Sequence, residues 1–189
     1  MKFRAVLLIL ISCLFLSGYK YEYHVEPLDA TANAVERNNQ GVAYMEFGHL
    51  NHAITEFRLA IALSPNSPSS ATFYNNLGIA YSKIGAYGAA QPCFEKAIEL
   101  NPVFIEYYNN LVTSYANDGS LASRLQTYKA QASANKMNSE ALFMMGLIYR
   151  ELGDKNNAID CFRRYIQIEK ENVLSRGAKQ MIYELKNEK

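Results

Sequence analysis

Apolar residues recur along most of the chain at the spacing of amphipathic helices. Tyr74 and Leu77 begin one apolar stripe, and Ala90 and Phe94 begin a second. Residues three and four apart share one face of a helix, so each stripe predicts a helix with one buried side. Gly85 lies between the two stripes. It is expected to end the first helix, because glycine readily takes the left-handed backbone of a C-terminal cap. The segment therefore predicts two helices joined by a tight turn.

This helix-turn-helix pattern repeats along the chain. Four glycines, Gly48, Gly85, Gly119 and Gly153, follow one another at intervals of 37, 34 and 34 residues. Further columns keep the same register: Gly41, Gly78, Val112 and Gly146; Tyr44, Tyr81, Tyr115 and Tyr149; Ala53, Ala90, Arg124 and Ala158; Phe57, Phe94, Tyr128 and Phe162. Fixed periods of this length are typical of repeat architectures. The longer first interval is explained by three extra residues within 66–70, where a connecting loop is expected.

In its period and order of residue types the pattern resembles the tetratricopeptide repeat. The resemblance implies an all-α fold, a right-handed superhelical α-solenoid of helix-turn-helix units. The units of this register are 34–67, 71–104, 105–138 and 139–172, and residues 173–189 are expected to form a capping helix. The third unit departs most from the pattern, at Val112, Arg124, Gln131 and Lys136. This leaves the packing inside that unit open.

The first helix of each unit carries a candidate binding surface. The resemblance places these helices on a concave face that binds proteins or peptides. A pair of asparagines recurs there, as Asn38 and Asn39, Asn75 and Asn76, and Asn109 and Asn110. Side-chain amides both donate and accept hydrogen bonds. Two interpretations remain open: the amides form a ladder that pairs with the backbone of an extended partner, or they bridge to the neighbouring helix.

Apolar and small residues complete the candidate surface. By register, Ile79 and Thr113 belong to the same face of the second and third units. In the fourth unit Phe143 and Met144 replace the asparagine pair, and Leu147 follows. Phe143 and Leu147 predict an apolar pocket, either for a partner's side chain or for the chain's own cap.

The N-terminus has a different character. Lys2 and Arg4 precede an uncharged, largely apolar run that ends at Ser17, so residues 1–18 resemble an export signal or signal anchor. Within it, Leu-Ile-Ser-Cys13 resembles the lipobox of bacterial lipoproteins, which predicts lipidation of Cys13. Cleavage to a soluble secreted form and an apolar tail on a cytosolic protein are the remaining alternatives. Residues 19–33 are expected to be a tether.

These features predict an exported or membrane-anchored protein of the bacterial cell envelope, on the periplasmic side. Membrane contact is expected through the N-terminus only.

The composition argues against several functions. The net charge of +1 gives no basic footprint for nucleic acid. His49 and His52 share a helix face but have no third ligand nearby, so no metal site is predicted. Cys93 and Cys161 lie two repeats apart, too far for a disulfide within one chain. No set of residues is arranged for catalysis, and neither an enzyme nor a cofactor is predicted.

The sequence therefore predicts a non-catalytic scaffold or adaptor that binds an extended segment of a partner protein in the concave groove. The alternative is a structural or assembly subunit of a cell-envelope complex that acts through self-association. The 14 tyrosines favour that alternative wherever they are exposed on the outer face.

Overall fold

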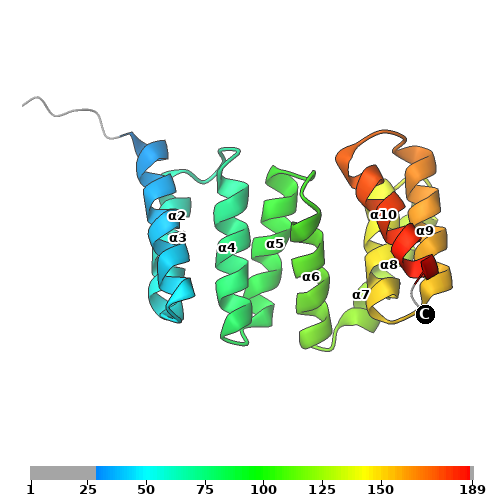
Figure 1. Cartoon of the computed structure of the whole chain (residues 1–189), viewed down its shortest axis with the longest axis horizontal. Coiled ribbons are helices and arrows are strands. Elements are labelled where there is room, and N and C mark those ends of the chain that lie inside the picture. The colour runs from blue at the N-terminus through cyan, green and yellow to red at the C-terminus, as the bar shows by residue number, and fades with distance from the viewer. Residues whose placement is uncertain (1–28, 188–189) are drawn as a thin grey trace, which may run out of the picture.

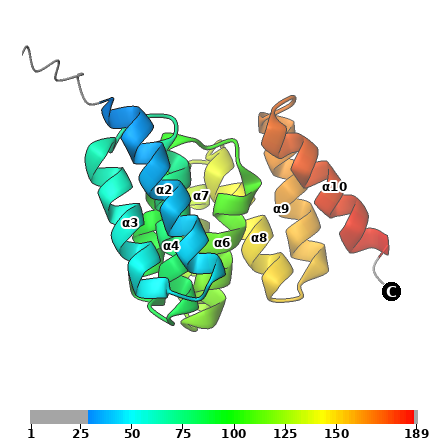
Figure 2. The same ribbon diagram turned by 60° about the vertical axis from the view of Figure 1, so that its left-hand side comes forward.

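The computed structural model describes residues 29–187, and these form nine helices and no strand. The helices are α2 (Ala30–Glu46), α3 (Leu50–Leu63), α4 (Ser70–Lys83), α5 (Tyr87–Leu100), α6 (Ile105–Asn117), α7 (Leu121–Ala134), α8 (Ser139–Glu151), α9 (Lys155–Ile168) and α10 (Val173–Asn187). They stand in a row in chain order (Figure 1). Figure 2 shows α8, α9 and α10 at the end of the row opposite α2. The predicted export signal and Cys13 lie outside the described residues.

The helix boundaries follow from local caps. The four turn glycines have φ between 75° and 78°, which confirms that glycine ends the first helix of each pair. At the start of α2, the Asp29 carboxylate accepts hydrogen bonds from the backbone N–H groups of Thr31 and Ala32, both at 3.0 Å. This N-cap begins the helix at Ala30, within residues 19–33 that were expected to be a tether.

The extra residues of the first interval lie in a loop, as predicted. α3 ends at Leu63 and α4 begins at Ser70. A serine cluster closes the loop: the Ser67 N–H donates to Ser70 Oγ at 3.0 Å, and the Ser70 hydroxyl donates to the Ser64 carbonyl. Because these bonds satisfy the loop's polar groups, the insertion leaves the helix faces on either side in register.

Three helix pairs are held together by a glycine packed against a phenylalanine ring. A Cβ atom built on Gly41, Gly78 or Gly146 would lie only 2.5–2.6 Å from the ring of the phenylalanine in the second helix of the same pair. These rings are at most 1% exposed. A side chain at any of the three glycines would therefore push the second helix away.

The third pair is opened. α6 and α7 pack against each other much less than the helices of the other pairs, and α6 lies more against α8 (Figure 1). Here Val112 replaces the glycine, and its side chain is buried. Tyr128 replaces the phenylalanine and remains half-buried. The isopropyl group of Val112 occupies the place where the ring would pack, so α7 cannot approach α6 closely.

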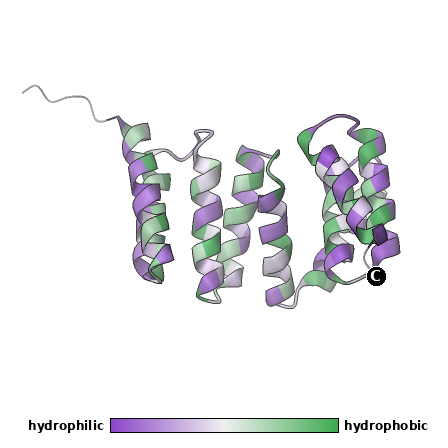
Figure 3. Ribbon diagram, in the orientation of Figure 1, coloured by the Kyte–Doolittle hydropathy of each residue, from purple (hydrophilic) through white to green (hydrophobic). Residues whose placement is uncertain are grey.

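The core runs along the whole row. Hydrophobic and hydrophilic residues are interspersed along the helices (Figure 3). The largest buried cluster extends from α4 to α10. α10 contributes Leu174, Ala178, Met181 and Leu185 to it, so this helix packs on the row through one apolar face.

Candidate protein-binding groove

Hydrogen bonds between asparagines join the first helices of successive pairs. Asn76 Nδ2 of α4 donates to Asn38 Oδ1 of α2 at 2.9 Å. Asn110 Nδ2 of α6 donates to Asn75 Oδ1 of α4, also at 2.9 Å. Asn38 and Asn75 are buried, so the acceptor of each bond is shielded from water. The first asparagine of one unit thus accepts from the second asparagine of the next.

The row of amides ends at α8, where an arginine takes over. Arg150 Nη2 donates to Asn109 Oδ1 of α6 at 2.9 Å. Phe143 and Met144 occupy the asparagine positions in α8 and are buried. The sequence reasoning did not assign Arg150 to this row. Arg150 is a basic residue on the same helix face as the asparagines of the other units, and this position could have indicated its place in the row.

These contacts match the bridging interpretation of the amides. Asn39 is exposed and faces solvent, whereas Asn76, Asn109 and Asn110 are half-buried. An amide nitrogen carries two hydrogens, and the bridges use one from Asn76 and one from Asn110. The second hydrogens and the Asn39 side chain remain as the polar groups that an extended partner could pair with.

A small cavity opens between α4 and α6 along this row, and we call it the α4–α6 groove. Its volume is about 220 Å³. Its lining residues are Ile79, Ser82 and Lys83 of α4, Tyr87 and Phe94 of α5, and Asn110, Thr113 and Asn117 of α6. The structure therefore brings together three residues that the sequence predicts for binding: Ile79, Asn110 and Thr113.

Phe143 and Leu147 lie in the core and do not line the α4–α6 groove. Both are 0% exposed. The Phe143 ring packs between the rings of Tyr108 and Tyr165, with centroid distances of 5.2 and 4.9 Å. Leu147 belongs to the same buried cluster, together with apolar residues of α10. Leu147 therefore packs in the same cluster as the chain's own cap, whereas Phe143 also lines a second cavity, described below.

α10 also reaches back along the row. A Cβ atom built on Gly177 of α10 would lie 2.4 Å from Ile105 Cδ1 at the start of α6. The glycine within this helix is explained by that close approach. Since α10 contacts the start of α6, it closes the end of the row over α8.

The described residues offer little for catalysis or metal binding. The His49 and His52 rings are 6.0 Å apart. Within residues 29–187 no group of three histidine, cysteine or acidic side chains is placed to hold a metal ion. Cys93 and Cys161 are both free thiols, and burial raises the pKa of each to about 11. Thiols of such high pKa are poor nucleophiles near neutral pH. Among the described helices, none combines the length and apolar character needed to cross a bilayer.

Several solved structures are similar to this chain. A tetratricopeptide repeat protein from Parabacteroides merdae matches with a TM-score of 0.50 and 20% identity, over 82% of this chain and 60% of that chain. A crystal structure of MamA matches with a TM-score of 0.48 and 27% identity, over 75% of this chain and 81% of that one. MamA from Desulfovibrio magneticus RS-1 has a TM-score of 0.48 and 16% identity, over 81% and 93% of the two chains. No curated protein matches the sequence significantly.

Family models identify the repeat itself. Tetratricopeptide repeat models match residues 37–67, 71–104 and 139–172, which together make up just over half of the chain. The matched segments correspond to the pairs α2–α3, α4–α5 and α8–α9, the three with a glycine packed on phenylalanine. The opened pair α6–α7 lies between them. The chain belongs to the tetratricopeptide repeat family.

Proposed function

We propose that this protein is a non-catalytic scaffold whose α4–α6 groove binds an extended segment of a partner protein. The observation that carries the proposal is the cavity that Ile79, Asn110 and Thr113 line together. The family is one of protein-interaction modules and is generally non-catalytic. At about 220 Å³ the cavity is smaller than the roughly 300–1,000 Å³ of small-molecule sites, and it suits one side chain of a longer ligand.

The groove offers both kinds of contact that a peptide needs. The half-buried Ile79 side chain provides apolar surface for a partner's side chain. The Asn110 amide and the Thr113 hydroxyl provide polar groups for the partner's backbone. Lys83 is exposed at the rim and favours a carbonyl or carboxylate oxygen beside it. Hydrogen bonds to the partner's backbone select an extended conformation of the partner more than a particular sequence.

A matched pair of threonine substitutions tests the groove. Peptides are first selected on the wild-type protein from a random-peptide library, and their affinities are measured by fluorescence polarisation. Thr113→Trp fills the groove and is expected to weaken binding at least about tenfold, or about 1.4 kcal/mol. Thr55→Trp places the same side chain at an exposed position of α3 outside the groove, and affinity should stay within about twofold of wild type.

The proposal fails if both variants bind the selected peptides as the wild type does, or if both weaken equally. Thermal melting of each variant is the folding control. Thr113 and Thr55 are both exposed, so neither substitution should change the melting temperature appreciably.

We also propose export and membrane attachment through the N-terminus. The support is the sequence of residues 1–18, with Lys2 and Arg4 before an apolar run and Cys13 in a lipobox-like setting. Mass spectrometry of the N-terminal peptide from the native host tests lipidation. An acyl group on Cys13 supports a lipoprotein, and an unmodified or retained Cys13 removes that assignment.

Self-association as an assembly subunit receives less support. That alternative depended on exposed tyrosines, and among the described tyrosines only Tyr44 and Tyr183 are exposed. Most of the others are buried or half-buried within the helix row. Light scattering of the full chain over a range of micromolar concentrations separates the two functions, since an assembly subunit would increase in mass with concentration.

A further inference from the structure

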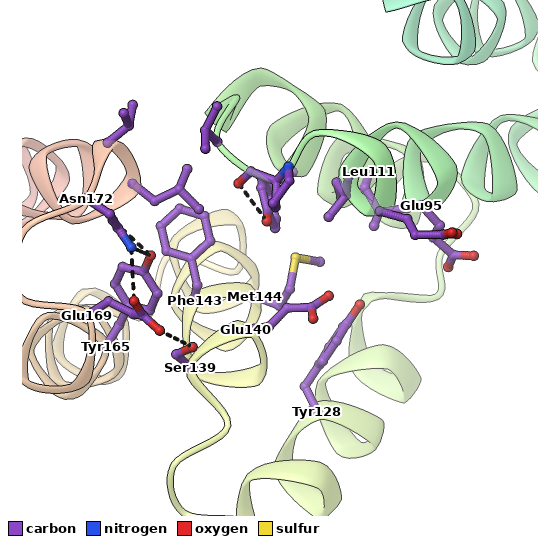
Figure 4. Close-up of a pocket in the computed structure, with 17 residues that line it drawn as sticks. Glu95, Leu111, Tyr128, Ser139, Glu140, Phe143, Met144, Tyr165, Glu169 and Asn172 are labelled. Atoms are coloured by element: carbon purple, nitrogen blue, oxygen red, sulfur yellow. Dashed lines mark hydrogen bonds between the residues drawn. The ribbon is translucent and has the colours of Figure 1, made fainter. Parts of the chain in front are cut away.

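A second and larger cavity lies where the third helix pair is opened. Its volume is about 570 Å³. The last turns of α5 and α9, the first turns of α8 and α10, and single faces of α6 and α7 surround it (Figure 4). It shares no lining residue with the α4–α6 groove. This cavity, which we call the α7 cavity, is therefore a separate place on the protein.

The departures of the third repeat create the α7 cavity. Since Val112 keeps α7 away from α6, Tyr128 cannot insert between the two helices as Phe94 does in the second pair. Figure 4 shows the Tyr128 side chain directed into the open space, toward Leu111 and Met144. In the other three pairs the equivalent phenylalanine fills its site, and burial leaves no room there.

Carboxylates and aromatic or apolar side chains dominate the lining. Its carboxylates are Glu95, Glu99, Glu140 and Glu169. Its apolar and aromatic walls include Ile98, Leu111, Tyr128, Phe143, Met144 and Tyr165. No lysine or arginine is among the lining residues. The α7 cavity thus combines negative charge with flat apolar surface.

Of the four carboxylates, only Glu99 has a cationic partner among the described residues. Lys96 pairs with Glu99 at 2.7 Å. Glu169 accepts hydrogen bonds from Ser139 at 3.0 Å and from Asn172 at 3.2 Å. In contrast, Glu95 accepts only a long bond of 3.3 Å from the Tyr115 hydroxyl. Glu140 lies in the first turn of α8, where the helix dipole favours its charge, and forms no ion pair.

Glu140 and Glu95 both affect the hydroxyl of Tyr128. Burial raises the pKa of Tyr128, a hydrogen bond with Tyr115 lowers it, and the negative charges of Glu140 and Glu95 raise it further. Arg124 acts in the opposite direction, but its guanidinium stacks on the Tyr115 ring at 4.7 Å and donates to Gln91 at 2.9 Å. No ion pair joins Arg124 to Glu95 or Glu140 among the described residues.

We propose that the α7 cavity binds an arginine side chain of a partner protein. A guanidinium group is planar, stacks on aromatic rings and donates to two carboxylates at once. Glu95 and Glu140, both exposed, would accept its hydrogen bonds, and its apolar stem would pack beside the half-buried Tyr128 ring. The cavity thus supplies both charge and ring surface.

The surroundings favour a protein segment over a free cation. Val103 and Val173 line the same cavity and are 43% and 49% exposed, the latter at the first residue of α10. Exposed valines at the mouth of a charged cavity offer contact to apolar residues on either side of the arginine. The partner segment is therefore expected to carry an arginine flanked by apolar residues.

The test uses a defined peptide and the full 189-residue chain. The peptide Ala-Leu-Arg-Leu-Ala, blocked at both ends, is titrated into isotopically labelled protein while backbone amide shifts are followed by NMR. Shifts are expected at residues that line the α7 cavity. Glu95→Gln with Glu140→Gln should weaken binding at least about tenfold, because charge-assisted hydrogen bonds are lost while the side-chain shape is kept.

Control variants isolate the effect of position from that of net charge. Glu36→Gln with Glu46→Gln removes the same charge at exposed positions of α2, and affinity should stay within about twofold of wild type. A peptide with glutamine in place of arginine should bind at least about tenfold more weakly. Thr113→Trp, which blocks the α4–α6 groove, should leave this binding unchanged, so the two proposals fail separately.

Three outcomes overturn the proposal. Equal weakening by the two double substitutions would mean a general effect of net charge. Equal affinity for the arginine and glutamine peptides would remove the role of the guanidinium. Argininamide binding as tightly as the peptide would make the ligand a small cation instead of a protein segment.

Discussion

Replacing Gly78 by alanine tests the packing that holds three of the four helix pairs together. The added Cβ atom would lie 2.6, 2.8 and 2.9 Å from the Cε1, Cδ1 and Cζ atoms of Phe94. All three distances are shorter than a carbon–carbon contact of about 3.5–4.0 Å. Phe94 is 1% exposed, so its ring cannot move without displacing other core residues. The substitution therefore forces α4 and α5 apart or strains the ring.

The expected magnitude is the difference between two effects. Alanine is better than glycine in a helix by about 1 kcal/mol. Overpacking a filled core costs about 1–3 kcal/mol. We expect Gly78→Ala to destabilise the protein by about 0–2 kcal/mol, because the steric cost exceeds the gain in propensity.

Gly88 provides the matched control. It lies in the first turn of α5, and a Cβ atom there would meet nothing within 4 Å. Gly88→Ala is expected to stabilise the protein by about 0.4–1 kcal/mol through the unfolded state. The same chemical change is thus expected to have opposite signs at two helical glycines. The two variants should differ by about 2–4 °C in melting temperature for each kcal/mol.

Urea denaturation of the full chain, followed by circular dichroism, measures both changes. Adding Phe94→Leu to Gly78→Ala should recover part of the loss, because a smaller side chain relieves the contact. A double-mutant cycle gives this coupling directly. If Gly78→Ala is as stable as Gly88→Ala, or if the coupling is zero, the glycine does not set the separation of the helices and the explanation of the opened third pair fails with it.

Two further predictions concern the amide bridges and the thiols. Asn75→Ala should destabilise the protein by about 1–3 kcal/mol in urea denaturation, because Asn110 loses its buried acceptor. Asn39→Ala, at an exposed position, should change the free energy of unfolding by less than about 0.5 kcal/mol. Equal effects of the two substitutions would show that the bridge contributes nothing to stability. Burial raises the pKa of Cys93 and of Cys161 from 9.0 to about 11. At pH 8 both thiols should therefore react with iodoacetamide about a hundredfold more slowly in the folded chain than in urea, as measured by peptide mass spectrometry. Similar rates in both states would contradict their burial.

The sequence predicts the features that depend on local contacts within a repeat. A turn glycine ends its helix through its own backbone, and Gly78 meets Phe94 only because both occupy fixed positions in one helix pair. The insertion between α3 and α4 is likewise a local matter. These features follow from spacing alone, since the period of a helix determines which residues share a face.

Features that depend on contacts between repeats were harder to predict. The amide of Asn76 has its partner 38 positions away, in another repeat, and its bond depends on how neighbouring helices are aligned. The burial of Phe143 and Leu147 depends on the path of α10, which returns far enough to place Gly177 on Ile105. The start of α2 at Ala30 required the Asp29 cap, which lies outside the repeat pattern.

A polar contact joins α7 of the opened pair to α5. Arg124 stands where the other pairs have a fully buried alanine, and a buried charge without partners would be costly. Its guanidinium donates to Gln91 at 2.9 Å and stacks on Tyr115, and Gln91 in turn donates to Asp118. The pKa of the Asp118 carboxyl is lowered, because hydrogen bonds from Ser120 and Gln91 and the charge of Arg124 outweigh its desolvation.

The departures of the third repeat are therefore compatible with one another. Val112 separates α6 from α7, and Arg124 at the separated position donates to Gln91 of α5, which in turn donates to Asp118 at the end of α6. Tyr128, no longer confined between helices, faces a cavity with carboxylates on its other side. Independent loss of the repeat pattern would be expected to leave a buried charge without a partner at such a position. These three residues instead replace the close packing of α6 and α7 with the α7 cavity. The proposed second binding surface therefore lies in the repeat that departs most from the pattern.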